Sequence, residues 1–128
     1  MIEQLSKVEE FHKAFGVPVN YKPVIPDEQT IILRYALAFE ELEEFREACA
    51  KKDSVAIFDA LVDQLYILLG TAHAFGFGPY LEEGFAEVHR SNMTKLDETG
   101  KPVYREDGKV IKSPLYEKPD LVTVLHKQ

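Results

Sequence analysis

The chain has 128 residues, of which 45% are hydrophobic and 29% charged, and its formal net charge is −7. This composition suits one folded domain with a modest core and argues against a disordered or repetitive chain. An acidic chain is also a poor general binder of nucleic acid, which attracts basic surfaces.

The same composition bears on where the protein works. We expect no membrane-spanning segment, because no run reaches the roughly 18 apolar residues that a bilayer requires. The N-terminal sequence MIEQLSKVEEFHK is too charged for a secretory signal. Cys49 is the only cysteine and cannot form an internal disulfide, which fits a reducing, cytoplasmic location.

The first half of the chain has the spacing of two helices. Residues 2–15 carry apolar side chains every three or four positions and stop before Gly16. Asp27 is a candidate N-cap for a long helix that reaches about Ala50. Its spacing predicts an inward face made of Ile31, Ile32, Tyr35, Leu37, Ala38, Leu42 and Phe45.

Two further helices are predicted after a short turn. Asp53 or Ser54 can cap a helix over residues 54–75, which is apolar on nearly all sides. Such a helix is expected to be buried by several neighbours, including another subunit. Pro79 suits the first turn of a fourth helix that reaches about Met93.

The tail after Leu96 has a different character. Residues 101–112 read as a short hairpin with Asp107-Gly108 at its turn, and two later prolines, Pro114 and Pro119, are expected to keep the rest extended. An isolated hairpin is marginal alone and should pack on the helices or on a partner.

These elements predict an all-α fold, a four-helix bundle with a short C-terminal β-hairpin tail. We expect a helical domain over residues 1–96, with residues 97–128 forming the hairpin and extended tail packed on it.

Acidic residues occupy two successive helices. Asp59 and Asp63 lie four residues apart in an apolar helix, where like charges on one face repel. Glu40, Glu41 and Glu44 share a broad sector of the preceding helix. If the two helices are antiparallel, the five carboxylates converge on one volume, and a hard cation would give each oxygen a partner.

This ligand set favours magnesium. Mg²⁺ prefers octahedral oxygen ligation and keeps waters or substrate phosphates in its shell, and Mn²⁺ can substitute. Neither motif contains Cys or His, which disfavours zinc. The pattern therefore points to Mg²⁺-dependent chemistry on a phosphorylated substrate.

The N-terminal helix offers aromatic rings. Phe11, His12 and Phe15 are candidates to stack on a nucleobase, because an aromatic face accepts any base. By helical spacing, Phe11 and Phe15 are equally good core residues.

Taken together, these residues resemble a known family. The order Glu40-Glu41-x-x-Glu44, a short connection and Asp63-Gln64-Leu65-Tyr66 resembles the MazG-like all-α nucleoside triphosphate pyrophosphohydrolases, a superfamily that includes phosphoribosyl-ATP pyrophosphohydrolase and the dimeric dUTPases. The likeness covers most of the chain. The segments that resemble a phage and bacterial branch are Phe11–Pro18, Gly70–Ala72, Glu87–Leu96 and Lys101–Lys109.

The resemblance implies an activity and a metal site. It implies hydrolysis of a (deoxy)nucleoside triphosphate between the α- and β-phosphates, to the monophosphate and pyrophosphate. It also implies Mg²⁺ held by Glu40, Glu41, Glu44 and Asp63. The usual second motif is Glu-x-x-Asp, but Ala60 stands three before Asp63 in this chain; Asp59, one residue earlier, is the candidate substitute.

The resemblance further implies contacts to phosphate near the end of the fourth helix. Arg90, Asn92 and Lys95 fall where the family places its phosphate-contacting Asn and Lys, and all three offer hydrogen-bond donors. One of two glutamates, Glu41 or Glu44, would accept the proton of the attacking water.

Two other classes of protein remain as alternatives. A di-iron carboxylate bundle needs two Glu-x-x-His units, and only Glu9-x-x-His12 is present. A non-catalytic helical module could use the acidic face to bind a partner. For the enzyme we expect a nucleoside triphosphate substrate, no nucleic-acid or membrane partner, a homotetramer or homodimer, and the cytoplasm of a bacterium or of a phage-infected host cell.

Overall fold

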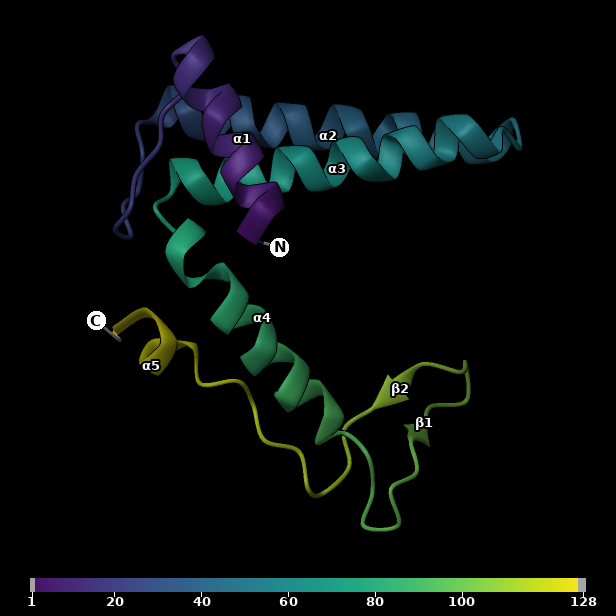
Figure 1. Cartoon of the computed structure of the whole chain (residues 1–128). Coiled ribbons are helices and arrows are strands. Elements are labelled where there is room, and N and C mark those ends of the chain that lie inside the picture. The colour runs from purple at the N-terminus through teal and green to yellow at the C-terminus, as the bar shows by residue number, and fades with distance from the viewer. Residues whose placement is uncertain (1, 127–128) are drawn as a thin grey trace. The chain divides into compact units, whose positions relative to one another are not determined.

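The computed structural model describes residues 2–126, except for the side chain of Ile2, and divides into two compact units (Figure 1). The first unit ends at Pro79 and the second begins at Tyr80. The unit boundary precedes most of the fourth helix, whereas the sequence analysis placed residues 1–96 in one domain. Backbone contacts alone do not define a catalytic domain, so the predicted domain limits stay a prediction.

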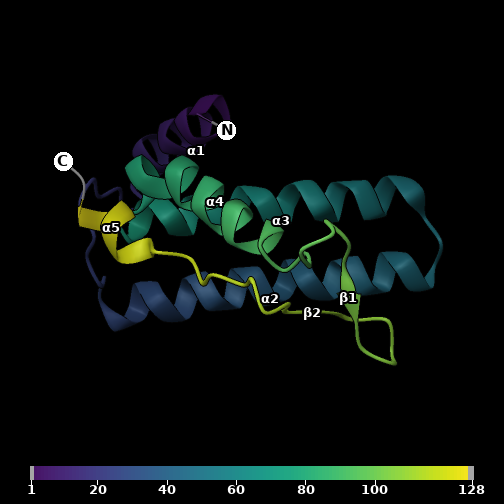
Figure 2. The same cartoon turned by 90° about the horizontal axis from the view of Figure 1, so that it is seen from below.

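The first unit consists of three helices whose bounds were predicted closely: α1 (Ile2–Phe15), α2 (Glu28–Ala50) and α3 (Ser54–Ala74). The long pair α2 and α3 runs antiparallel and side by side in both views, and α1 packs on α3 (Figures 1 and 2).

Aspartate side chains set the starts of the long helices. Asp27 accepts a hydrogen bond from the backbone N–H of Thr30 at 2.8 Å, and Asp53 accepts one from Ala56 at 3.1 Å. Each bond satisfies a backbone donor that has no partner within its helix. Between the helices, Lys52 takes a left-handed conformation with φ 54°, which lets the chain reverse within a few residues.

A buried arginine joins α2 to α3. Arg34 on α2 donates from Nε to Thr71 Oγ1 at 3.0 Å and from Nη2 to the carbonyl oxygen of Ile67 at 2.7 Å. A Cβ at Gly70 would lie 2.6 Å from Arg34 Nη2 and 2.7 Å from His12 Nε2. The missing side chain at Gly70 therefore lets groups from α1 and α2 reach the backbone of α3.

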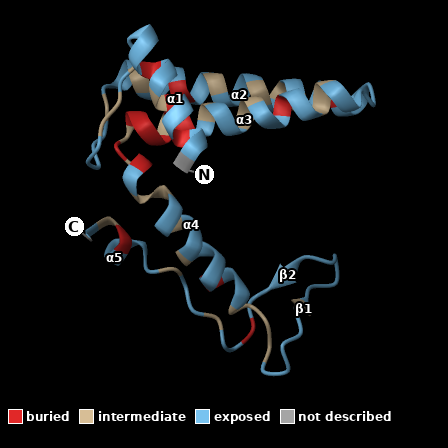
Figure 3. Cartoon of the chain, viewed as in Figure 1, coloured by how far each residue is buried: buried red, intermediate tan, exposed pale blue. Residues whose placement is uncertain are grey.

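The predicted inward face of α2 is largely wrong. Leu37 and Phe45 are half-buried, but the other five predicted residues are exposed, and the buried side chains of α2 are Arg34 and Ala48. The physical reason is that α2 packs along one helix, α3, so most of its apolar stripe has no cover. Figure 3 shows the same exposure along both long helices. Large exposed side chains on α3 are Val55, Phe58, Leu61, Val62, Leu65, Tyr66 and Leu68.

The expectation about membrane spans needs correction, because α3 is long and apolar enough to cross a bilayer by length and composition. Core helices of soluble proteins meet the same criterion, so one such helix is weak evidence. Asp59 and Asp63 lie inside this helix, and ionised carboxylates are costly in a bilayer.

The second unit is built around α4 (Gly78–Met93). The predicted hairpin is present as β1 (Val103–Tyr104) and β2 (Val110–Ile111), an antiparallel pair. Gly108 has φ 86° at the turn, a conformation that favours glycine. Two serines tie the tail to α4 and the turn that follows it: Ser91 Oγ donates to the carbonyl oxygen of Glu117 at 2.7 Å, and Ser113 Oγ to that of Leu96 at 2.7 Å.

The end of the tail was predicted to be extended, but it contains a fifth helix, α5 (Leu121–His126). Asp120 caps it, accepting from the backbone N–H of Thr123 at 3.1 Å and from its hydroxyl at 2.7 Å. Pro119 stops the preceding chain from being helical, yet it leaves the residues after it free to start a helix.

Candidate metal centre

Three of the five predicted carboxylates come together between α2 and α3. Glu41, Glu44 and Asp63 each offer an oxygen, and these oxygens all lie within 4.8 Å of one another. The local structure explains the meeting. Glu41 and Glu44 are three residues apart on one helical face, while Glu41 lies eleven residues before Lys52 and Asp63 eleven after it, so the antiparallel pair sets them opposite each other.

The charges that act on Glu41 in the described part of the chain are those of other carboxylates. Burial, with the neighbouring carboxylates of Glu44, Asp63 and Glu40, raises the pKa of Glu41 to about 7. Glu41 Oε2 is buried and has no hydrogen-bond partner among the described residues. A buried oxygen without a partner destabilises a fold unless something else satisfies it.

A hard divalent cation fits this donor set. The cluster offers carboxylate oxygens from three residues, the ligands that Mg²⁺ and Mn²⁺ prefer, and the orphaned Glu41 oxygen points to a missing partner. No histidine or cysteine belongs to the cluster in the described part of the chain, which does not favour zinc.

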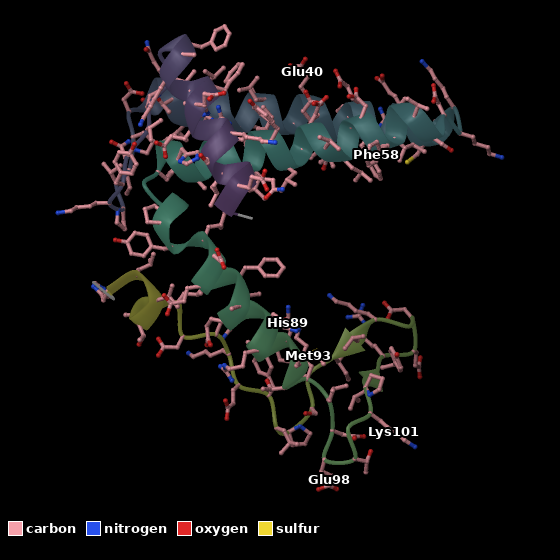
Figure 4. The ribbon with its side chains drawn as sticks, in the orientation of Figure 1. Glu40, Phe58, His89, Met93, Glu98 and Lys101 are labelled. Atoms are coloured by element: carbon pink, nitrogen blue, oxygen red, sulfur yellow. The ribbon has the colours of Figure 1, made fainter. Side chains whose placement is uncertain are left out.

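The other two predicted ligands, Glu40 and Asp59, lie outside the cluster. Both are exposed. Figure 4 shows Glu40 projecting outward from α2, although its charge still contributes to the raised pKa of Glu41. Their role at the site stays a prediction.

The predicted phosphate contacts belong to the second unit. Arg90 already pairs with two carboxylates, Glu87 at 2.8 Å and Glu117 at 2.9 Å. The side-chain hydrogen bonds from Arg90, with the backbone N–H of Asp120, lower the pKa of Glu87 to about 2. Asn92 is exposed and Lys95 half-buried.

The predicted base-stacking residues differ in exposure. Phe11 and Phe15 are 42% and 70% exposed and stack on each other with centroids 4.4 Å apart. His12 is buried instead, and its Nδ1 donates to the carbonyl oxygen of Pro18 at 3.0 Å. Only the two phenylalanines of this set present a ring at the surface.

Two further residues beside the cluster were not singled out from the sequence. Tyr66 lies three residues after Asp63 and meets the ring of Phe11 edge-on at 5.7 Å, so it connects the aromatic pair to the acidic helix. Gln64 Nε2 is buried and unpartnered among the described residues. In the sequence, only their positions one and three residues after Asp63 indicate that Gln64 and Tyr66 lie near the site.

The two residues of the Glu9-x-x-His12 unit have partners outside the acidic cluster. Glu9 accepts from the hydroxyl of Tyr21 at 3.0 Å and pairs with Lys13 at 2.8 Å. Neither Glu9 nor His12 belongs to the acidic cluster, so the geometry does not build the ligand set of a di-iron bundle.

Paired helices that gather acidic oxygens, with a small hairpin tail, fit the MazG-like nucleoside triphosphate pyrophosphohydrolase superfamily, and the match to a family model decides the assignment. Residues 8–92 match the model of the family described as phosphoribosyl-ATP pyrophosphohydrolase. The chain belongs to this family, and its members are nucleotide pyrophosphohydrolases that typically depend on a metal.

One curated relative is similar over most of the chain. It is an uncharacterized protein, L479, of Acanthamoeba polyphaga mimivirus, 31% identical over 110 residues. The match covers 83% of this chain but only 41% of the viral protein, so the chain spans about two fifths of that relative's length.

Proposed function

We propose that the protein hydrolyses a (deoxy)nucleoside triphosphate between its α- and β-phosphates in the presence of Mg²⁺, giving the nucleoside monophosphate and pyrophosphate. One observation carries the proposal: Glu41, Glu44 and Asp63 bring carboxylate oxygens within 4.8 Å of one another, and Glu41 Oε2 is buried without a partner among the described residues. Family membership supports the reaction class.

In the proposed mechanism all three carboxylates hold the metal, and one of the two glutamates also accepts a proton. Glu41, Glu44 and Asp63 would hold the divalent ion, which supplies positive charge against the triphosphate when it is bound. A water attacks the α-phosphorus as the bond to the bridging oxygen breaks, and the electron pair leaves with pyrophosphate. Glu41 or Glu44 accepts the proton of that water. Glu44 is exposed and Glu41 partly buried, so the two differ in their access to water.

Substrate contacts complete the proposal. Arg90, Asn92 and Lys95 would donate hydrogen bonds to phosphate oxygens. Three of the five N–H donors of Arg90 bond to Glu87 and Glu117 in the described structure, and the other two could reach a phosphate. The exposed pair Phe11 and Phe15 would stack on the base.

The exposed apolar residues of α2 and α3 support a proposal about association. A homodimer or homotetramer would cover them, because contiguous apolar surface of this kind marks an interface. Light scattering of the purified chain tests this, and a monomer at working concentrations contradicts it. We also propose a cytoplasmic location with no nucleic-acid or membrane partner, in keeping with the acidic charge and the single free Cys49.

The alternative is a non-catalytic helical interaction module that binds a partner through the acidic face around Glu41, Glu44 and Asp63. A nucleotide panel separates the two functions: each triphosphate is incubated with full-length protein and Mg²⁺, and pyrophosphate is measured. The enzyme predicts release that fails in Glu41→Gln and Asp63→Asn but persists in Glu47→Gln, a control on the same helix outside the cluster. No release from any nucleotide would favour the interaction module.

A further inference from the structure

We infer that this chain alone holds one divalent ion, on Glu41, Glu44 and Asp63, and that a second ion arrives with the triphosphate. The inference rests on the proposed function and concerns the number of ions bound before the substrate.

The size of the cluster matches one coordination shell. Mg²⁺ lies about 2.1 Å from its oxygen ligands, so oxygens around one ion are separated by about 3 to 4 Å. The oxygens of Glu41, Glu44 and Asp63 lie within 4.8 Å of one another, which is close to the separation of ligands around one ion. Two-ion sites place their metals about 3.5 to 4 Å apart and therefore need additional carboxylates to bridge both.

The position that could supply a fourth carboxylate carries a methyl group. Ala60 lies eight residues after Lys52 and Glu44 eight before it, so the antiparallel helices set Ala60 opposite Glu44. Ala60 is only 2% exposed and offers no ligand atom.

Neither neighbouring acid replaces the missing group. Asp59 is one residue before Ala60, and one residue turns the side chain by about 100° around the helix. Asp59 is exposed and outside the cluster, and Glu40, one residue before Glu41, is likewise exposed and outside it. A second ion would thus take most of its ligands from triphosphate oxygens and water, an arrangement that suits Mg²⁺.

The test counts bound Mn²⁺, used as the probe, on the full chain without nucleotide. Isothermal titration, with electron paramagnetic resonance of free Mn²⁺, should give one ion per chain. Asp63→Asn and Glu44→Gln should weaken binding at least about tenfold, while Asp59→Asn and Glu47→Gln should leave the count and affinity unchanged. Circular dichroism melts confirm that each variant is folded, and either cluster variant alone is sufficient for the comparison.

Adding a triphosphate analogue with a non-hydrolysable α–β bridge should raise the count to two. Two ions of similar affinity without nucleotide, the loss of one ion in Asp59→Asn, or a count that stays at one with the analogue would overturn the inference. Failure of the proposed function is separate. If the chain binds two ions without nucleotide but releases pyrophosphate, the proposed function holds and the inferred metal count is wrong. If it binds one ion but turns over no nucleotide, the metal count holds and the proposed function is wrong.

Discussion

Replacing Glu41 by glutamine should stabilise the metal-free protein while abolishing its stabilisation by metal. The Glu41 carboxyl ionises near pH 4.5 in the unfolded chain and near 7 in the folded one. Between these values the folded state holds more protons, so the free energy of unfolding falls as pH rises from about 4.5 to 7 and stays lower above 7. The difference corresponds to at most about 3.4 kcal/mol, and solvent at this partly exposed site reduces it to on the order of 2 kcal/mol.

Glutamine has a similar shape and no charge, so the penalty disappears. At pH 8 in EDTA, Glu41→Gln should melt roughly 6 °C above the wild type, and the two should converge near pH 4.5. Saturating Mg²⁺ or Mn²⁺ should reverse the order, because metal at a hundred times its dissociation constant stabilises the wild type by about 2.7 kcal/mol and the variant loses a ligand.

Differential scanning calorimetry with and without metal measures both effects, and Glu47→Gln serves as the matched control that should show neither. A Glu41→Gln variant that melts below the wild type in EDTA at pH 8 would refute the reasoning, since it would show that the buried carboxylate is satisfied within the metal-free fold.

Three other predictions follow from the packing. Burial, with the nearby Arg34 and His73 charges, lowers the pKa of His12. The unfolded chain therefore binds a proton at His12 more readily than the folded one, and the wild type should lose stability relative to His12→Asn as pH falls below about 6.5. Equal stabilities of the two proteins across this pH range in urea titrations would contradict this. Gly70→Ala should destabilise by about 1 to 2 kcal/mol despite its helix propensity, because the new Cβ meets a buried guanidinium at 2.6 Å, and a gain in melting temperature would disprove it. Asp120→Ala should lower protection of the α5 amides in hydrogen exchange through loss of about 1 kcal/mol of capping, and unchanged protection would show that the cap is dispensable.

The limits of the long helices followed from local chemistry, and for that reason the sequence predicted them well. Asp27 and Asp53 are N-caps, a role set by a side chain and a backbone donor three residues away. The same rule applies to Asp120, which caps α5 although Pro114 and Pro119 favour an extended chain before it. The inward face of α2 could not be predicted from spacing, because burial depends on how many neighbours pack against the helix, and Tyr35 and Leu42 are exposed.

The site was predictable to the extent that helical geometry determines it. The spacing of Glu41, Glu44 and the opposite Asp63 brings their oxygens together. The spacing did not predict that Asp59 lies outside the carboxylate cluster. In a helix that is apolar on nearly all sides, the sequence does not show which side packs against the neighbouring helix. The partnerless state of Glu41 Oε2 depends on every surrounding side chain and is visible only in three dimensions.

The most direct test of the central claim is a turnover in ¹⁸O-labelled water with Mg²⁺ and the best substrate of the nucleotide panel, read by mass spectrometry. Attack on the α-phosphorus predicts the label in the nucleoside monophosphate and none in pyrophosphate, with turnover lost in Asp63→Asn. Label in the pyrophosphate, or an Asp63→Asn variant as fast as the wild type, would contradict the assignment of the reaction to these carboxylates.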